Sequence, residues 1–441
     1  MNTPICSFLT KYVSDNNLRL HMPGHKGIGE VEKFDLTEVR GADSLYEANG
    51  IIKESEENAS QLFGCHTLYS AEGSSLVIRA MLHLACLMNK GSGNPVILAG
   101  RNAHKVFISA SALCGFDIEW LYGENTSYLS CKVSANDVAE KLDGMERLPL
   151  AVYITSPDYL GNMADIEGIA RVCHSRGVLL LVDNAHGAYL AFTEPSMHPI
   201  ALGADMCADS AHKTLPCLTG SAYLHLADSI PEGIKARAKS ALALFGSTSP
   251  SYLILASLDM ANRYLSDGYK DKLAGFSRKL AETKANLTSI GYEIIGDEPM
   301  KLTVCPKSYG YTGYELADIL AKNKIVPEFY DNDHLVLMPT PEITENELAK
   351  LEVVLLALKK REKITKAPPI LGMPKRRLSP REAIFSDAET VDSCDAIGRV
   401  LADITIGCPP AVPIVVSGEE IDENATRAFE YYGIDKCSVV K

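Results

Sequence analysis

The sequence predicts an α/β protein whose main domain is built on a largely parallel sheet. From about Ile51 onward, helical stretches alternate with short apolar segments of strand length, a pattern typical of parallel strands joined by crossover helices. Clusters of polar residues also follow directly after several of these segments. Ligands of open α/β sheets bind beyond the carboxyl ends of the strands. The chain of 441 residues is long enough for two or three domains with a substantial core.

The strands expected in the main domain are short apolar runs bounded by Gly, Pro and polar residues. They are Thr67–Ser70, Pro95–Ala99, Asp117–Tyr122, Leu150–Thr155, Val178–Val182, Asp205–Ala208 and Ser221–His225. The helices expected before and between them cover residues 51–63, 72–89, 102–114, 134–142 and 165–176. A long helical stretch from about Pro250 to Ile290 ends this part of the chain.

A second, shorter alternation predicts a small α/β domain. Its strands are expected at Lys301–Cys305 and His334–Met338, and its helices at 312–323 and 343–360. Lys366-Ala-Pro-Pro then indicates a linker. A C-terminal α+β domain follows, with helices expected at 379–385 and 389–397 and a Pro-rich turn at 409–413. The predicted division is an N-terminal arm (1–50), a large domain (51–270), a small domain (271–365) and a C-terminal domain (366–441).

Composition excludes several classes of partner. The net charge of −13 argues against nucleic acid and anionic membranes, because both select for basic surfaces. No apolar run approaches the ~20 residues of a membrane span, and the N-terminus lacks a signal-peptide pattern. The 12 cysteines are scattered without a C-x-x-C pair, so we expect reduced thiols. These features predict a cytoplasmic protein.

Two residues at strand ends carry the chemical prediction. Asp183 ends the apolar run that starts at Val178, and Lys213 follows the next short strand in the sequence Ser-Ala-His-Lys. A lysine amine can bond covalently to the aldehyde of pyridoxal 5'-phosphate, and an aspartate against the pyridine nitrogen keeps that nitrogen protonated. Taken alone, the Asp would more often cap a turn and the Lys would more often be a solvated surface residue. The flanking residues favour the cofactor site instead.

Five polar clusters are expected at the same edge of the sheet. Because Gly73-Ser74-Ser75 opens a helix, free backbone N–H groups there could bind a phosphate, although Ser is also a common N-cap. The ring of His104 could stack on a flat cofactor. The clusters are Gly73-Ser-Ser75, Asn102-Ala-His104-Lys, Ser156-Pro-Asp-Tyr159, Asp183-Asn-Ala-His186 and Ser210-Ala-His212-Lys213.

A metal site is not expected. His21 and His25 are four residues apart, but the Pro-Gly between them prevents the helix on which that spacing would align two ligands. No third ligand lies nearby in the sequence.

Taken together, these motifs resemble the bacterial ornithine/lysine/arginine decarboxylase family. The resemblance covers nearly the whole chain in the family's order, and the length is similar to that of the shorter members without an N-terminal wing domain. It implies a fold-type I, aspartate aminotransferase-like large domain that binds pyridoxal 5'-phosphate. The motifs are His21-Met-Pro-Gly-His-Lys-Gly, Gly100-Arg-Asn-Ala-His104-Lys, Asp183-Asn-Ala-His-Gly, Ser210-Ala-His-Lys213-Thr-Leu-Pro, Thr248-Ser-Pro-Ser-Tyr252 and Ala256-Ser-Leu-Asp.

The resemblance also implies a role for each matching residue. Lys213 is expected to hold the cofactor covalently, Asp183 to pair with the pyridine nitrogen, and His104 to stack on the ring. His186 is expected near the phenolic oxygen. The expected phosphate ligands are Ser74 and Ser75 after Gly73, Ser210, His212 and, across a homodimer interface, Ser249.

Three motifs depart from the family's usual pattern and leave the substrate open. The usual Asn-Gly-Ser/Thr is Glu72-Gly-Ser here, Asp-Glu-Ala-His is Asp183-Asn-Ala-His, and Tyr-Pro-Pro-Gly-Ile-Pro is Cys408-Pro-Pro-Ala-Val-Pro. None of these changes removes a catalytic group. The acidic residue that meets the distal cation of a basic substrate is also open, with Asp158, Glu72 and Asp43 as candidates.

The leading hypothesis is therefore decarboxylation of arginine, lysine or ornithine by a homodimer or larger homo-oligomer. Aminotransferases of this fold usually hold the substrate α-carboxylate with an arginine from the small domain, and residues 279–360 contain none. Transamination, aldol-type cleavage and acyl condensation on the same scaffold remain alternatives. So does a non-catalytic paralogue that binds a polyamine or a basic amino acid.

Overall fold

A seven-stranded sheet forms the centre of the computed structural model, which describes residues 1–123, 126–407 and 412–441. The strand order is β1-β7-β6-β5-β4-β2-β3. Neighbouring strands from β3 to β6 are parallel, and β7 is antiparallel to both β6 and β1. The mainly parallel sheet predicted from the sequence is thus confirmed. The strands are β1 (His66–Ser70), β2 (Val96–Gly100), β3 (Asp117–Leu121), β4 (Ala151–Thr155), β5 (Leu179–Asp183), β6 (Met206–Asp209) and β7 (Ala222–Leu226).

Helices cover both faces of this sheet, which explains why its strands are apolar on both sides. In β5, Leu180 and Val182 pack on the face covered by α5 and α6, whereas Leu181 packs on the face covered by α3 and α4. The helices of this domain are α2 (Ile51–Phe63), α3 (Gly73–Leu87), α4 (Lys105–Cys114), α5 (Ala135–Asp143), α6 (Ile166–His174), α7 (Ala211–Thr214), α8 (Glu232–Lys235), α9 (Ala238–Phe245) and α10 (Tyr252–Leu265).

The N-terminal arm contains a helix that the sequence did not predict, α1 (Pro4–Ser14), which packs on α2 and α10. Its buried Ile5 and Leu9 join the core beside these helices. Residues 18–31 then run without α-helix or strand and expose several apolar side chains, including Leu18 at 83%, Leu20 at 85% and Ile28 at 89%.

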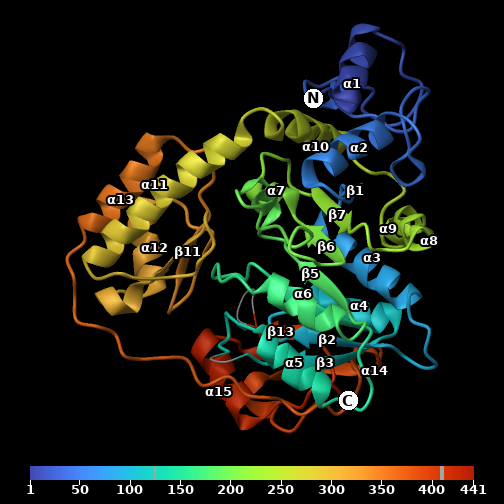
Figure 1. Cartoon of the computed structure of the whole chain (residues 1–441). Helices are drawn as coiled ribbons and strands as arrows, with labels where there is room; N and C mark the ends of the chain where they lie inside the picture. Colours follow the sequence, from blue (N-terminus) through green and yellow to red (C-terminus); the bar gives the residue numbers. More distant parts are fainter. Residues whose placement is uncertain (124–125, 408–411) are drawn as a thin grey trace.

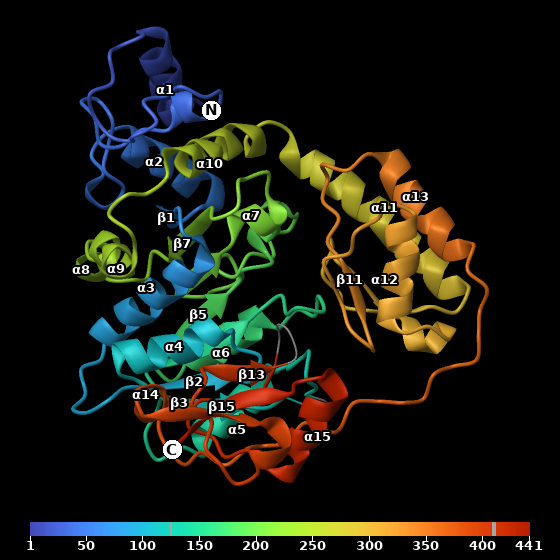
Figure 2. The same ribbon diagram turned by 180° about the vertical axis from the view of Figure 1, so that it is seen from behind.

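The small domain is a four-stranded sheet of order β10-β11-β9-β8 with helices packed against it. The sequence missed the short edge strands β8 and β10, and Gly268 at φ 72° separates α10 from α11 where one helical stretch was expected. Figure 2 shows the domain beside the carboxyl ends of the large sheet. Its elements are α11 (Tyr269–Ser289), β8 (Glu293–Ile295), β9 (Leu302–Cys305), α12 (Gly313–Lys322), β10 (Phe329–Tyr330), β11 (Leu335–Leu337) and α13 (Glu345–Leu356).

In the C-terminal region the predicted helix at 389–397 is wrong. Residues Ala388–Asp392 form strand β12, which pairs antiparallel with the last strand, β15. The segment pairs with a strand more than forty residues further along the chain, and tertiary pairing of this kind overrides local propensity. The other elements are α14 (Pro380–Ile384), β13 (Thr405–Gly407), β14 (Pro413–Val416), α15 (Glu423–Tyr432) and β15 (Lys436–Val440). Residues 409–411 of the predicted Pro-rich turn lie outside the described residues.

A buried ion pair joins the C-terminal region to the large sheet. Arg101, directly after β2, donates to both carboxylate oxygens of Glu419 at 2.7 Å, and both side chains are almost fully buried. The guanidinium also lies over the ring of Trp120, 4.8 Å from its centroid. Bidentate pairing of this kind fixes the orientation of the two groups.

Within residues 1–123, 126–407 and 412–441, no helix combines the length and the apolarity needed to cross a bilayer.

Candidate active site

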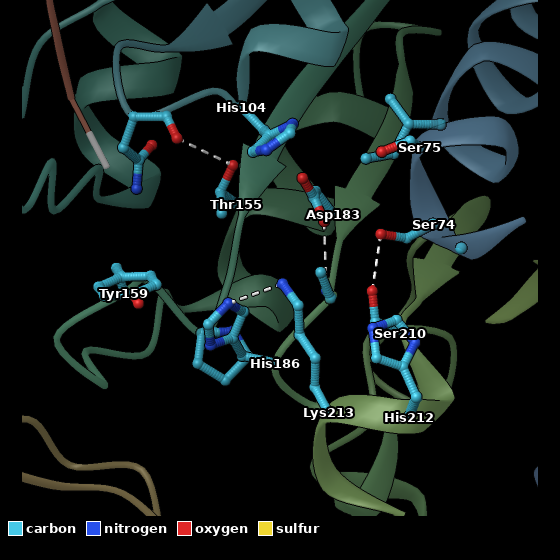
Figure 3. A pocket seen from close by; sticks show the side chains of 15 residues that line it. Ser74, Ser75, His104, Thr155, Tyr159, Asp183, His186, Ser210, His212 and Lys213 are labelled. Carbon is cyan, nitrogen blue, oxygen red and sulfur yellow. Dashed lines mark hydrogen bonds between the residues drawn. The ribbon is translucent and has the colours of Figure 1, made fainter. Parts of the chain in front are cut away.

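A cavity of about 280 Å³ opens at the carboxyl edge of the large sheet, where the sequence placed the polar clusters. Figure 3 shows it from close by. Because β2, β4, β5 and β6 are parallel neighbours or near neighbours, the residues that follow them converge on one space. The cavity is lined by Gly73, Ser74, Ser75, Ile78, Asn102, His104, Thr155, Pro157, Tyr159, Asp183, Ala185, His186, Ser210, His212 and Lys213.

Lys213 lies on the single turn of α7 that follows β6, and its side chain extends into the cavity. Burial lowers the pKa of its amine, while the charge of Asp183 acts in the opposite direction. The Nζ atom is 3.0 Å from Nε2 of His186. A desolvated amine of lowered pKa is a suitable nucleophile for a carbonyl carbon.

Asp183 ends β5, and its carboxylate is held from two sides. The phenol of Tyr153 on β4 donates to Oδ2 at 3.0 Å, and the amide of Ala185 donates to Oδ1 at 3.2 Å. Both bonds fix the orientation of the carboxylate. Asp183 is buried but lines the cavity, so a ligand in the cavity can contact it.

The start of α3 offers an anion site beside the hydroxyl of Ser210. Gly73 has a positive φ of 73°, and no side chain caps the first amides of this helix in the described part of the chain. Ser210 donates to the hydroxyl of Ser74 at 2.7 Å, which brings both hydroxyls to one place. Nδ1 of His212 is 2.9 Å from the carbonyl of Ser221, so Nδ1 carries a proton and Nε2 remains for other partners. These donors suit a phosphate group.

His104 is the N-cap of α4 and faces the same cavity. Its Nδ1 accepts from the amide of Val106 at 3.2 Å, which orients the ring. Burial lowers its pKa, so the imidazole is neutral near pH 7. In Figure 3 the ring of His104 lies on the opposite side of Asp183 from Lys213.

All but one of the site residues predicted from the sequence line this cavity. The exception is Ser249, which lies exposed in the loop between α9 and α10, where its amide bonds to the hydroxyl of Ser247 at 3.1 Å. Its predicted role across a dimer interface stays a prediction.

The acidic candidates for the distal cation are already engaged elsewhere. Asp43 accepts backbone amides of its own loop, including Asn49 and Gly50. Asp158 accepts from Ser130 at 2.6 Å and from the side chain of Asn162 at 2.8 Å. Glu72 accepts from the amide of Ser247 at 2.6 Å.

Tyr159, the last residue of the predicted cluster Ser156-Pro-Asp-Tyr159, lines the cavity and donates to Glu328 at 3.3 Å. Sequence reasoning missed two residues of the small domain that bear on the cavity, Glu328 and Lys301. Nζ of Lys301 lies 3.1 Å from Nδ1 of His186. Both residues lie on a domain far along the chain from Lys213, so no local motif links them to the site.

Comparison with known proteins agrees with this geometry. Residues 3–290 match the family described as Orn/Lys/Arg decarboxylase, major domain. The chain belongs to the Orn/Lys/Arg decarboxylase family. Two arginine decarboxylases are similar: that of Halalkalibacterium halodurans is 31% identical over 96% of this chain and 91% of its own length, and that of Bacillus subtilis is 29% identical over 97% and 93%.

A solved lysine decarboxylase from Francisella novicida has the same fold. It aligns with 100% of this chain and 81% of its own, with a TM-score of 0.83 and 18% identity. The predicted fold-type I architecture and the predicted family are therefore confirmed. As a member of this family of pyridoxal-phosphate-dependent enzymes, the protein is an amino-acid decarboxylase.

Proposed function

We propose that this Orn/Lys/Arg decarboxylase family member uses pyridoxal 5'-phosphate to decarboxylate a basic L-amino acid, which is arginine, lysine or ornithine. The observation that carries the proposal is the placement of Lys213, a buried amine of lowered pKa, in one cavity with the carboxylate of Asp183. When bound, the cofactor supplies an electron sink for the pair of electrons left on the α-carbon after carbon dioxide departs.

The residues present fit this cofactor. Lys213 supplies the amine for covalent attachment, and Asp183, held by Tyr153, keeps the pyridine nitrogen protonated. The uncapped start of α3 with Ser74, Ser75, Ser210 and His212 binds the phosphate. The neutral ring of His104, which lines the same cavity, would pack against the face of the cofactor.

Glu328 is the acidic group best placed to meet the distal cation of the substrate. It lies just before β10 of the small domain and contacts Tyr159, which lines the cavity. Its charge also acts on Lys213 and raises the pKa of that amine, against the larger effect of burial. A carboxylate in contact with a residue that lines the cavity attracts an ammonium or guanidinium group.

The small domain favours decarboxylation over transamination. Its residues 279–360 contain no arginine to clamp the substrate α-carboxylate. A tight clamp would stabilise the ground state of the group that must leave as neutral carbon dioxide, and ground-state binding of that kind does not accelerate the reaction.

The active form is proposed to be a homodimer or a larger homo-oligomer. Residues 18–31 expose Leu18, Leu20 and Ile28 without a cover in the described part of the chain, and exposed apolar side chains gathered in one segment are typical of an interaction surface. The exposed loop that carries Ser249 is then available to a partner subunit.

The test is to mix the purified protein and pyridoxal 5'-phosphate separately with arginine, lysine and ornithine. The expected products are carbon dioxide and agmatine, cadaverine or putrescine from one preferred substrate. Release of a 2-oxo acid instead would favour transamination, and binding without any product would favour a non-catalytic paralogue.

A further inference from the structure

Lys301 is a buried lysine behind the cavity, placed directly before β9 and only 2% exposed. Its ammonium group has three polar neighbours. Nζ is 3.1 Å from Nδ1 of His186 and 3.2 Å from the carbonyl oxygen of Asp158. It also forms an ion pair with Oε2 of Glu298 at 3.0 Å.

These three neighbours define the hydrogen-bonding role of His186. A lysine ammonium has three N–H donors and no acceptor, and Nζ lies within hydrogen-bond distance of the carbonyl oxygen of Asp158 and of Nδ1 of His186. Nδ1 of His186 must therefore accept, so the ring proton lies on Nε2. That is the nitrogen 3.0 Å from Lys213, whose neutral amine can accept from it.

The environment of Glu298 keeps Lys301 in place. The phenol of Tyr189 donates to Oε1 of Glu298 at 3.2 Å and orients the carboxylate. Burial raises the pKa of Glu298, while the ammonium of Lys301 opposes that effect. A buried acid and a buried amine in contact stabilise each other's charge, because separating them would leave one charge unpaired.

The ring of His186 is neutral in this environment. Burial lowers its pKa well below the usual value, and the ammonium group of Lys301 adds to the effect. A neutral imidazole has one donor and one acceptor, so the partner of one nitrogen decides the proton position on the other.

We propose that Lys301 is a positioning residue: paired with Glu298, it donates to Nδ1 of His186 and thereby fixes the Nε2-protonated form whose N–H points into the cavity. The consequence for catalysis rests on the proposed function. If the phenolic oxygen of the cofactor lies beside His186, the fixed N–H donates to that oxygen in every turnover. With the other tautomer, a lone pair would face the oxygen and repel it.

The direct test needs no cofactor, and its one variant serves only to assign the His186 resonances. Cofactor-free protein is labelled with ¹⁵N-histidine, and the His186 resonances are assigned by comparison with His186→Gln. We expect a neutral ring with unprotonated Nδ1 and protonated Nε2. A ring protonated at Nδ1 in the wild-type protein would overturn the inference, whether or not the protein decarboxylates anything.

Two variants then test whether Lys301 is the cause. Lys301→Met keeps the length of the side chain but removes the donor, and we expect it to shift His186 toward a mixture of tautomers. Turnover is expected to fall roughly 10–100-fold with cofactor still bound, the range known for outer-shell partners of metal-binding histidines.

Lys284→Met is the matched control, because it removes a lysine near the same Glu298 that does not contact His186. It should leave both the ¹⁵N pattern and turnover near wild type. Equal ¹⁵N patterns for Lys301→Met and the wild type would show that another group fixes the tautomer. Since the wild-type spectrum is read first, failure of Lys301→Met to fold still leaves that decisive measurement.

The two proposals fail in different ways. An Nε2-protonated His186 in a protein that releases no carbon dioxide from any basic amino acid would contradict the proposed function and support the role of Lys301. Carbon dioxide release by a protein with Nδ1-protonated His186 would do the reverse.

Discussion

The phenol of Tyr159 donates to Oε1 of Glu328 at 3.3 Å, and this bond joins the loop after β4 to the small domain at the cavity. Burial raises the pKa of the Tyr159 phenol, and the charge of Glu328 raises it further, so the phenol keeps its proton throughout the physiological range. The tyrosine thus donates, and the carboxylate of Glu328 accepts.

Glu328→Gln is expected to raise KM for the preferred basic amino acid roughly 10–100-fold, with a smaller effect on kcat. A hydrogen bond to a charged group contributes about 1.5–3 kcal/mol, which corresponds to that range. Tyr159→Phe is the companion variant, because it removes the neighbour and keeps the charge. An unchanged KM for Glu328→Gln in steady-state assays would exclude Glu328 as the group that meets the distal cation.

Lys213→Ala is expected to abolish covalent attachment of the cofactor and to lower turnover by orders of magnitude. Within the cavity as described, Lys213 is the lysine that lines the wall, and loss of its amine removes the nucleophile. The check is borohydride reduction followed by peptide mass spectrometry. Cofactor trapped on another lysine, with activity kept, would disprove the assignment.

Asp183→Asn is expected to bind the cofactor with little catalysis. An amide cannot keep the pyridine nitrogen protonated, so the electron sink is lost while Tyr153 can still bond to the side chain. Cofactor content from absorbance and turnover from product release are measured on the same sample. Turnover like that of the wild type would show that Asp183 does not face that nitrogen.

Glu419→Ala is expected to lower the free energy of unfolding by about 3–5 kcal/mol, because it leaves the buried guanidinium of Arg101 without its partner. The adjacent Glu420 offers a matched control, since its pairing with Arg377 is partly exposed. Glu420→Ala should change the same quantity by about 1 kcal/mol or less. Urea denaturation of both variants gives the comparison, and equal losses would contradict the assigned role of the buried pair.

Complementation tests the shared site. Lys213→Ala and Ser249→Glu are each expected to be inactive alone and to recover part of the activity when mixed. In a mixed dimer, one site carries both changes and the other carries neither. If mass spectrometry shows chain exchange and no activity returns, Ser249 does not complete a partner's site.

The elements predicted most accurately were those whose local pattern of apolar and polar residues indicates how they are buried. The strand ending at Asp183 is a buried apolar run with helices on both faces, and α2 begins and ends where the periodicity predicted. The segment 389–397 was misread because Ala388–Asp392 is half of a pairing whose other half is Lys436–Val440. Helix α1 was missed because its burial depends on contacts with α10.

The same limit applies to the site. Lys213, Asp183 and the Gly73-Ser-Ser segment were found because each follows a strand of one parallel sheet, and topology brings such positions together. Lys301 and Glu328 belong to another sheet, and their approach to His186 and Tyr159 depends on how the two domains pack. No spacing within the sequence encodes that approach.

The most direct measurement of the central claim follows the substrate carboxyl carbon. The protein is incubated with pyridoxal 5'-phosphate and each basic amino acid labelled with ¹³C at the carboxyl carbon, in deuterated water. For the preferred substrate we predict labelled carbon dioxide and an amine that carries one deuterium at the former α-carbon. Label retained in a 2-oxo acid, or no labelled carbon dioxide from arginine, lysine or ornithine, would contradict the account.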